Sequence, residues 1–337
     1  MKKEPRILCY ICTCNRYDTT LPMAMVSIIN QTRKPDKIVI YDDSKEPRDP
    51  RNIEHYRYLF ELMNLKKIPF DYLWTEKKGA HFNHEKANMA GFDLAWFIDD
   101  DCVAEPNCLE ELLKEMKDNV GAVGGLILRP PAGPLPPNIT DNKIDDIVKY
   151  PNIQWFTWQG KPRHVEHIYS SYLYKTGLAH YDLRLSSVSF RGETMFTHSL
   201  LLKGYRLLIT PNAITYHFQS MGGIHDRQKT ELWNHDEEIF RKWLKFQRLG
   251  KKLYVLNNGL GDHYMFLQAI KPEPDSVIAC CYPDALQGHP NIMSIAEAKQ
   301  MVDLSQYDVY EWCRVHGWTG SLVEAFRRLY EDLDRSR

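Results

Sequence analysis

The first 128 residues alternate short apolar runs with amphipathic segments of helix length. Apolar runs of four to eight residues predict buried strands, and apolar positions spaced three and four apart predict helices that pack on a sheet. The predicted strands are 6–12, 37–42, 70–75, 94–98 and 121–127, and the predicted helices are 20–31 and 106–117. Because strands that alternate with helices are typical of βα units, this pattern predicts an α/β fold around a largely parallel sheet.

Both predicted helices carry further signals. The helix over 20–31 has Thr20 as a candidate N-cap and Pro22 in its first turn, where the missing N–H costs nothing. The helix over 106–117 places four apolar side chains on one face, namely Leu109, Leu112, Leu113 and Met116. Each helix is therefore predicted to bury one face.

The chain changes character after residue 128. Five prolines in the run RPPAGPLPPNI, residues 129–139, cannot continue a helix or a central strand, and they predict a loop or crossover. An aromatic segment follows with Trp155, Phe156 and Trp158, whose rings either complete a core or line a groove. Residues 165–218 then return to strand-like and helix-like patterns.

The last third of the chain has its own pattern. A segment rich in charged and aromatic residues predicts a helix over about 226–248. The small βαβα unit expected after it has strands at 253–256 and 277–281 and helices at 263–270, 294–303 and 320–333. We therefore expect a main domain over 1–225, a helical connector over 226–250 and a small α/β lobe over 251–337.

Composition excludes some classes of protein. The 337 residues include 43 Lys and Arg against 44 Asp and Glu, so no global positive field favours nucleic acid. We find no run of about 18 apolar residues and no secretory leader, so we expect a cytoplasmic protein without a transmembrane segment. The eight cysteines show no disulfide framework and are expected to be reduced, with Cys12 and Cys14 on one face of a buried strand.

Three consecutive carboxylates, Asp99, Asp100 and Asp101, follow the apolar run that ends at Ile98. Ligands of open α/β sheets bind at the carboxyl ends of the strands. Side chains two positions apart share a face of extended backbone, so Asp99 and Asp101 are expected to converge and Asp100 to point away. Clustered carboxylates favour a hard cation, Mg²⁺ or Mn²⁺, together with substrate phosphates. The alternative is a solvated acidic turn that caps the following helix.

A second acidic pair, Asp42 and Asp43, ends the predicted strand KIVIY. This pair falls at the same edge of the same predicted sheet and could accept hydrogen bonds from a nucleotide base or ribose. The alternative is the capping of a turn. Because strand-end acids separated by further βα units converge on one crevice, the two acidic groups together indicate a single site.

At this point the sequence resembles a known family. The opening ICTCNRYDTTLPMAMVSIINQTRKPDKIVIYDDS is similar to the start of family 2 glycosyltransferases, and FIDDDCVAEPNCLEEL is similar to the D-x-D element of that family. VGGLIL and FRGETMFTHSLLLKGYRLLITPNAITYHF resemble its later strand and its acidic catalytic region, so the likeness covers about 6–218. The resemblance implies a GT-A nucleotide-diphospho-sugar transferase fold, a Rossmann-like, mostly parallel sheet flanked by helices.

The resemblance also implies roles for single residues. Thr13, Asn15 and Arg16 would border the nucleotide, and Asp42 or Asp43 would contact its base. Asp99 would face the ribose or sugar, with Asp100 also among the nucleotide-sugar-binding residues, and Asp101 would ligate the metal that bridges the diphosphate. His217 is similar to the histidine that often adds a protein ligand. The positions near the diphosphate match less closely and are Lys86 and Asn88, with Lys78 as the alternative.

The sequence departs from the common family pattern at one position. Thr194 stands where the second residue of a Glu-Asp pair is frequent, and a threonine cannot serve as a general base. An inverting transfer needs a carboxylate to take the proton of the acceptor hydroxyl, and Glu193 is the remaining candidate. The alternative role of Glu193 is to stabilise the N-terminus of the helix that starts near Met195.

The turn GLGD, Gly259 to Asp262, follows a predicted strand and opens a predicted helix. Such a turn can hold a phosphate on backbone N–H groups. Because too few residues follow for a second complete nucleotide-binding domain, we expect an appended Rossmann-like lobe that packs on the main domain or helps to grip the acceptor. A second nucleotide site is the alternative.

The sequence thus predicts an inverting glycosyltransferase that uses Mn²⁺ or Mg²⁺ and a nucleotide-diphosphate sugar, first of all a UDP-sugar. A saccharide, a lipid carrier, a protein or a hydroxylated DNA base would be the acceptor. The basic stretch 241–252 could touch a phosphate backbone, although a solvated helix face explains it as well. The alternatives are a catalytically silent nucleotide-sugar binding module and a nucleotidyltransferase.

Overall fold

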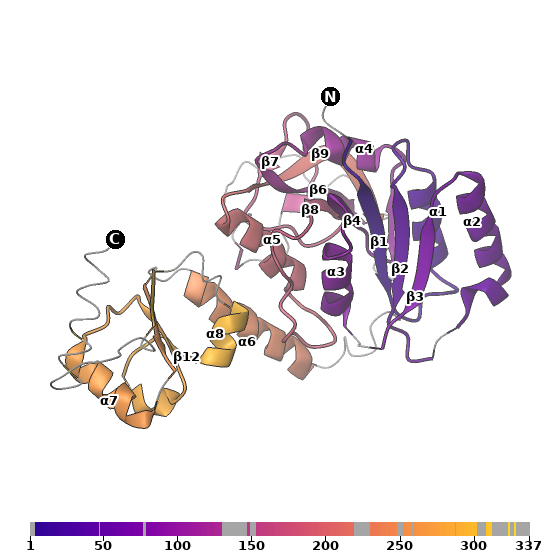
Figure 1. The fold of residues 1–337 in the computed structure, drawn as a ribbon. Coiled ribbons are helices and arrows are strands. Elements are labelled where there is room, and N and C mark those ends of the chain that lie inside the picture. Colours follow the sequence, from indigo (N-terminus) through magenta and orange to yellow (C-terminus); the bar gives the residue numbers. More distant parts are fainter. Residues whose placement is uncertain are drawn as a thin grey trace. The chain divides into compact units, whose positions relative to one another are not determined.

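The chain forms two compact units, Met1–Glu237 and Glu238–Arg337, each of which is described by itself (Figure 1). The computed structural model describes residues 4–46, 48–76, 79–129, 147–148, 153–218, 230–247, 252–257, 259–286, 288–301, 308–311, 323 and 327. The predicted proline-rich loop after residue 129, Lys78 and most of the predicted helix 320–333 lie outside these residues. No helix among the described residues has the length and apolar character needed to span a bilayer.

The first half of the main sheet is parallel, as predicted. Its strands stand in the order β3-β2-β1-β4, with β1 at Ile7–Thr13, β2 at Lys37–Asp42, β3 at Phe70–Trp74 and β4 at Leu94–Phe97. The predicted bounds of these four strands are confirmed to within one residue. Parallel order places the carboxyl ends of all four strands at one edge of the sheet.

The second half of the sheet is mixed. The order continues as β8-β6-β9-β5, with β5 at Cys102–Ala104, β6 at Val120–Leu128, β8 at Tyr172–Lys175 and β9 at Arg206–His217; β7 at Arg163–His164 also pairs with β9. Strand β8 runs antiparallel to both β4 and β6. Strand β5 is only three residues long, and the sequence pattern did not predict it.

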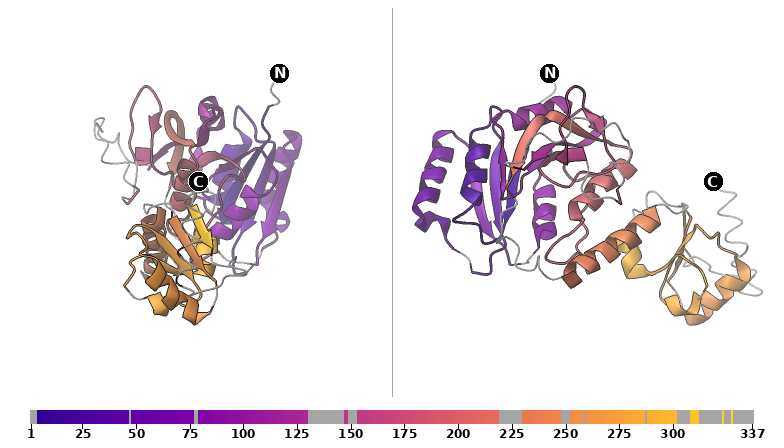
Figure 2. Two further views of the ribbon diagram at one scale, coloured as in Figure 1. Left: turned by 60° about the vertical axis from the view of Figure 1, so that its left-hand side comes forward. Right: turned by 180° about the vertical axis from the view of Figure 1, so that it is seen from behind.

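Helices cover both faces of the sheet (Figures 1 and 2). One face packs against α1 (Leu21–Ile29), α2 (Glu54–Leu65) and α4 (Cys108–Glu115), and the other packs against α3 (Ala80–Asn88) and α5 (Gly192–Leu202). Strand β1 is buried by helices on both faces. Ile7, Cys9 and Ile11 pack in the core beneath α1, α2 and α4, and Leu8 and Tyr10 pack in the core beneath α3 and α5. A strand buried on both faces needs apolar residues at nearly every position, which explains its unbroken apolar run.

The ends of two helices differ from the prediction. Thr20 is the N-cap of α1 with proline in the first turn, but its backbone is helical and its side chain makes no capping hydrogen bond. An N-cap hydroxyl reaches the next turn only from extended backbone, which Thr20 lacks. Helix α4 covers only Cys108–Glu115, so Met116 follows the helix, but it still packs against the same core as Leu109 and Leu112.

The second unit contains a four-stranded, wholly parallel sheet. Its order is β12-β11-β10-β13, with β10 at Lys252–Leu256, β11 at Val277–Cys280, β12 at Ile292–Ser294 and β13 at Asp308–Glu311. Helices α7 (Leu260–Ala269) and α8 (Ile295–Met301) belong to this unit, and the boundary between the units falls within α6 (Thr230–Gln247). Helix α7 begins at Leu260, so the expected GLGD turn is already helical at Gly261.

Candidate functional site

A cavity of about 660 Å³ opens at the carboxyl ends of the parallel strands of the first unit. Cavities of this size hold ligands as large as nucleotides and drugs. Eight of the residues that the sequence singled out line it, and these are Thr13, Arg16, Asp43, Asp99, Asp100, Asp101, Glu193 and His217. The sheet therefore brings together groups that lie far apart along the chain.

The order of the strands explains this convergence. Strand β1 lies between β2 and β4, and its last residue, Thr13, is in register with Asp42. Strand β4 is paired so that Tyr10 faces Phe97, and the same register brings Asp99 and Asp100 level with the last two residues of β1. The predicted meeting of the two acidic groups at one edge follows from parallel pairing.

His217 reaches the same place through the short strand β5. This strand starts immediately after the three aspartates and pairs antiparallel with the end of β9, with Cys102 opposite His217. The backbone N–H of Phe218 donates to the carbonyl oxygen of Asp101 over 2.9 Å. As a result, His217 Nε2 lies 3.1 Å from Asp101 Oδ1.

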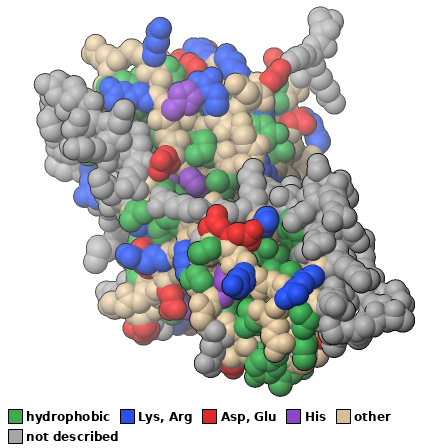
Figure 3. Space-filling model, turned by 90° about the vertical axis from the view of Figure 1, so that its left-hand side faces the viewer, with side chains coloured by type: hydrophobic (Ala, Val, Ile, Leu, Met, Phe, Trp, Pro, Cys, Tyr) green, Lys and Arg blue, Asp and Glu red, His purple; other side chains and the backbone are tan. Residues whose placement is uncertain are grey.

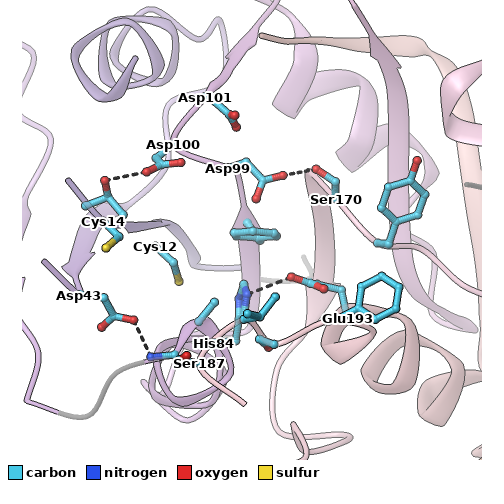
Figure 4. Close-up of a pocket in the computed structure, with 18 of the residues that line it drawn as sticks. Cys12, Cys14, Asp43, His84, Asp99, Asp100, Asp101, Ser170, Ser187 and Glu193 are labelled. Atoms are coloured by element: carbon cyan, nitrogen blue, oxygen red, sulfur yellow. Dashed lines mark hydrogen bonds and ion pairs between the residues drawn. The ribbon is translucent and has the colours of Figure 1, made fainter. Parts of the chain in front are cut away.

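A buried arginine compensates the negative charge. Nη1 of Arg16 lies 2.9 Å from Asp100 Oδ1 and 2.7 Å from Asp101 Oδ2, and Thr13 Oγ1 donates to Asp100 over 2.7 Å. Figure 4 shows Asp100 turned toward the end of β1, which carries Cys12 but ends before Cys14, contrary to the expectation of both on one strand. Asp99 turns toward Ser170 and accepts a hydrogen bond from its hydroxyl. Asp100 thus turns away from Asp99, but Arg16 links it to Asp101, and all three aspartates line the cavity.

Burial and neighbouring charges shift the pKa values of these three carboxyl groups in different directions. Burial raises the pKa of Asp100 to about 7, although Arg16 and Thr13 oppose this rise. Burial also raises the pKa of Asp99, with His217 opposing. For Asp101, burial would raise the pKa, but the hydrogen bonds and charges of His217 and Arg16 outweigh it and hold the pKa below the ordinary value. Asp101 is therefore the carboxylate that stays ionised most readily.

The donor atoms in this region fit a divalent cation. One ligand atom each from Asp99, Cys102 and His217 lie within 4.8 Å of one another, and Asp101 lies beside His217. Carboxylate oxygens and an imidazole nitrogen suit Mn²⁺, whereas a thiol is a soft ligand that such a cation does not prefer. The fitting set is therefore Asp99, Asp101 and His217, which adds Asp99 to the two predicted ligands.

The structure separates the roles of Asp42 and Asp43. Asp43 lines the cavity and accepts hydrogen bonds from the backbone N–H of Gly79 over 2.8 Å and from Asn83 Nδ2 over 2.9 Å. Asp42 is fully buried and accepts from the hydroxyls of Tyr17 and Tyr72. Among the described residues, Asp43 and not Asp42 faces the site.

Glu193 enters from the first turn of α5, on the side of the cavity opposite Asp43 (Figure 4). Its side chain is 18% exposed, and its Oε1 lies 3.3 Å from Nε2 of the buried His84 on α3. Thr194 is fully buried next to it and also lines the cavity. Sequence reasoning did not single out His84, which lies two residues before Lys86.

Besides Asp42, three predicted nucleotide-site residues are not among the lining residues that the structure describes. Lys86 is exposed on α3, and Asn88 is buried, where its side chain donates to the carbonyl of Ala179 and accepts from the N–H of Gly177. Asn15 has a positive φ of 57° and donates its backbone N–H to Ser44 Oγ. The expected contact of Lys86 and Asn88 with a diphosphate therefore has no support from their positions.

In the aromatic segment, Trp155 lines a groove and Trp158 completes a core, so each of the two expected roles is found. Trp155 lines the cavity, its ring stacks 6.0 Å from that of Tyr169, and the guanidinium of Arg129 lies 4.7 Å above it. Trp158 instead packs against the core on the α3 and α5 face of the sheet. Tyr169 and Ser170 also line the cavity, and no motif in the sequence pointed to them.

Comparison with solved structures shows the fold. The S. aureus TarS fragment 1-349, crystallised in complex with UDP-GlcNAc, has a TM-score of 0.51 and 11% identity, covering 72% of this chain and 66% of that chain. The chain thus shares the fold of a nucleotide-sugar transferase, and the GT-A fold expected from the resemblance is confirmed. At this identity the likeness concerns the fold alone.

Two further structures are similar at a lower score. GalNAc-T7 with UDP, GalNAc and Mn²⁺ has 13% identity and a TM-score of 0.49, covering 74% of this chain and 52% of that chain. Mannosyltransferase PcManGT from Pyrobaculum calidifontis, with GDP-Man and Mn²⁺, has 16% identity and a TM-score of 0.48, covering 71% and 65%. This chain therefore spans from about half to about two thirds of the chains that it resembles.

Comparison of sequences gives the family. No curated protein matches the chain significantly. The model of glycosyl transferase family 2 matches residues 9–172, a span that contains Thr13, Asp43 and the three consecutive aspartates. The chain therefore contains a glycosyl transferase family 2 domain over this span.

Proposed function

We propose that the protein is a metal-dependent, inverting glycosyltransferase that moves a sugar from a nucleoside diphosphate to an acceptor hydroxyl. One observation carries the proposal. A single cavity holds the aspartates with His217 on one side and the carboxylate of Glu193 on another. A sugar transfer needs two such groups, one region that stabilises a leaving diphosphate and one base at the reacting carbon.

Asp101 and His217 would hold a Mn²⁺ or Mg²⁺ ion, with the Asp99 carboxylate beside them. When bound, this cation would neutralise the negative charge that develops on the leaving diphosphate. The Arg16 guanidinium contacts both Asp100 and Asp101 at less than 3.0 Å and offsets part of their negative charge. We infer that Arg16 lies beside the diphosphate, where a guanidinium fits phosphate oxygens.

The nucleotide would occupy the part of the cavity between the ends of β1 and β2. Thr13 and Asp43 line this part, and Asp43 is fixed by the Gly79 and Asn83 hydrogen bonds. The Thr75 hydroxyl is a third donor to Asp43. A carboxylate held by three donors presents its remaining lone pairs in a defined direction, which suits recognition of a base N–H. We therefore assign the base contact to Asp43 and not to Asp42.

The reaction follows from the position of Glu193. The oxygen of the acceptor hydroxyl attacks the anomeric carbon on the face opposite the diphosphate, so the configuration of that carbon inverts. The bond between the anomeric carbon and the diphosphate oxygen breaks, and its electron pair stays with the diphosphate. Glu193 takes the hydroxyl proton as the new bond forms. Thr194 offers no carboxylate, so Glu193 is the base in this proposal.

A UDP-sugar is the first donor to test, and GDP-mannose is the second. The proposed chemistry requires only that the acceptor carry a hydroxyl group. Saccharides, lipid carriers and proteins all supply such a group. On the face drawn in Figure 3, Lys and Arg side chains of described residues are interspersed with Asp and Glu. This mixture of charges disfavours a DNA acceptor, because nucleic-acid binding draws on clustered positive charge.

The proposal is tested by donor hydrolysis, in which water replaces the acceptor. UDP-glucose, UDP-galactose, UDP-GlcNAc and GDP-mannose are incubated with the full chain and MnCl₂, and released nucleoside diphosphate is measured. We expect release from at least one donor, with loss of release in Glu193→Gln and Asp101→Asn. Binding of every donor without release would indicate a silent binding module. In a separate incubation with UTP and glucose 1-phosphate, release of pyrophosphate would indicate a nucleotidyltransferase.

A further inference from the structure

His84 is a buried imidazole that points at the proposed base from a cage of aromatic rings. Its side chain is fully buried on α3, and its ring stacks on Tyr181 with centroids 4.9 Å apart and an interplanar angle of 13°. Phe97 meets its edge at 4.4 Å, and Tyr10 meets it at 5.6 Å. This packing fixes the plane of the imidazole, so both ring nitrogens have defined directions.

The two ring nitrogens have different partners. Nδ1 lies 2.9 Å from the hydroxyl of Tyr10, and Nε2 lies 3.3 Å from Oε1 of Glu193 (Figure 4). Burial raises the pKa of Tyr10 well above its ordinary value, so its hydroxyl keeps a proton to donate. If Tyr10 donates to Nδ1, the neutral imidazole carries its proton on Nε2, and that N–H faces the carboxylate.

Neither group has another partner for this contact. Among the described residues, no donor makes a hydrogen bond to the Glu193 carboxylate, and the acceptor that faces His84 Nε2 is Glu193 Oε1 at 3.3 Å. An N–H left unpaired inside an aromatic cage would be destabilising, because it loses its hydrogen bonds to water without replacing them. A small movement of the Glu193 side chain would shorten the 3.3 Å separation to an ordinary hydrogen bond.

Glu193 has a particular need for a fixed neighbour. Thr194 stands where the family often has an aspartate, so the longer glutamate side chain must place the carboxylate. A glutamate side chain has one more rotatable bond than an aspartate side chain. Rotation about this bond must be restricted for the carboxylate to stay in its reactive position. A base displaced by about 1 Å loses roughly a hundredfold in rate.

We propose that His84 is a positioning residue that donates its Nε2 proton to Oε1 of Glu193 and so directs Oε2 toward the acceptor hydroxyl. This inference rests on the proposed function, because it takes Glu193 as the general base. Tyr10 supports the arrangement by fixing the tautomer of the imidazole. Thus a residue from α3 compensates for the changed catalytic pair at the start of α5.

Two substitutions at His84 separate hydrogen bonding from packing. His84→Phe keeps the ring and its stacking on Tyr181 but removes the N–H, whereas His84→Gln keeps an N–H near the position of Nε2. With whichever tested nucleotide sugar is hydrolysed fastest, we expect His84→Phe to lower kcat about 10- to 100-fold. His84→Gln should stay within about fivefold of the wild type, and KM for the donor should change less than about twofold in both variants.

A control and a double mutant complete the test. His81→Phe changes another fully buried histidine of α3 that does not line the cavity, and it should leave kcat unchanged. If His84 acts through Glu193, the double variant Glu193→Gln with His84→Phe should be no slower than Glu193→Gln alone. The thermal unfolding midpoint of each variant identifies any that fails to fold. If His84→Phe does not fold, the histidine tautomer measured with His84→Gln still tests the inference.

The outcomes separate the two claims. Loss of kcat in Glu193→Gln with full kcat in His84→Phe would overturn the role of His84 alone. Equal losses in His84→Phe and His84→Gln, or a full additional loss in the double variant, would also overturn it. Full activity of Glu193→Gln would remove the base assignment and this inference together. Independently of turnover, ¹⁵N shifts of histidine-labelled protein should report the Nε2–H tautomer for the signal missing in His84→Gln, and the Nδ1–H tautomer would contradict the inference.

Discussion

His217 Nε2 lies 3.1 Å from Asp101 Oδ1, at the point where β9 ends beside the start of β5. Asp101 also contacts Arg16 over 2.7 Å, so one carboxylate is shared between an imidazole and a guanidinium. A metal ion placed between Asp101 and His217 would replace their direct contact. The contact between Asp101 and Arg16 would remain and would balance part of the negative charge. The predictions below follow from this geometry and from the position of Glu193.

Removal of the Asp101 charge should abolish metal-dependent chemistry. We expect Asp101→Asn to lower donor hydrolysis at least about 100-fold, because an amide is a weaker ligand than a carboxylate for a hard cation. The nucleoside diphosphate released in the presence of MnCl₂ measures this loss. Asp71→Asn on β3 is the matched control, since Asp71 lies outside the cavity lining, and a similar loss there would contradict the assignment.

His217 should affect metal affinity more than the rate at saturating metal. We expect His217→Asn to raise the Mn²⁺ concentration that gives half-maximal hydrolysis by about 10- to 100-fold, the range seen when metal-site partners are lost. Treatment with EDTA should stop hydrolysis by the wild type, and added Mn²⁺ should restore it. An unchanged Mn²⁺ requirement in His217→Asn would show that His217 is not a ligand.

Glu193 should act on the rate and not on donor binding. We expect Glu193→Gln to lower kcat about 10²- to 10⁴-fold, the usual contribution of a general base. The dissociation constant of UDP with Mn²⁺, measured by calorimetry, should stay within about threefold of the wild type. A matched fall in UDP affinity would instead place Glu193 in the nucleotide site.

Asp42 should contribute to stability. Asp42→Ala leaves the buried hydroxyls of Tyr17 and Tyr72 without their acceptor, so the free energy of unfolding should fall by about 2–4 kcal/mol. Urea unfolding measures this change, and Asp71→Ala, an exposed aspartate on β3, should change stability by less than about 0.5 kcal/mol. Calorimetry should show little change in UDP affinity for folded Asp42→Ala.

Stability should fall in mild acid because of His81. Burial lowers the pKa of His81 from 6.5 to about 4, so the unfolded chain binds a proton near pH 6.5 and the folded chain only near pH 4. This contribution to stability is complete above pH 6.5 and is lost as the pH falls toward 4, by about 3 kcal/mol in all. Urea unfolding at several pH values should show a shallower dependence in His81→Phe, and an identical dependence would contradict this cause.

Local sequence patterns were enough to predict the site-bearing strands. The apolar runs of β1, β2 and β4 are unbroken because both faces are buried, and the acids after β2 and β4 mark the strand ends. Parallel pairing then required these ends to meet. The choice between Asp42 and Asp43 depended on which residue leaves the core at the strand end, and that detail came only from the structure.

Other parts of the site depended on contacts between distant segments. Helix α3 carries polar residues on its buried face, including His81, Asn83 and His84, so it lacks the apolar spacing that identifies a helix. Lys86 lies two residues, or about 200°, around the helix from His84, which explains its exposure. The three-residue strand β5, which aligns Cys102 with His217, is too short to give a periodic signal.

The central claim is that one divalent ion and one diphosphate occupy the cavity together. A crystal of the full chain soaked with MnCl₂ and UDP, measured for anomalous scattering from manganese, tests this claim most directly. We predict one Mn²⁺ peak in coordination distance of Asp101 and His217 and in contact with the UDP diphosphate. A manganese peak elsewhere, or UDP bound without manganese at these two residues, would contradict the account.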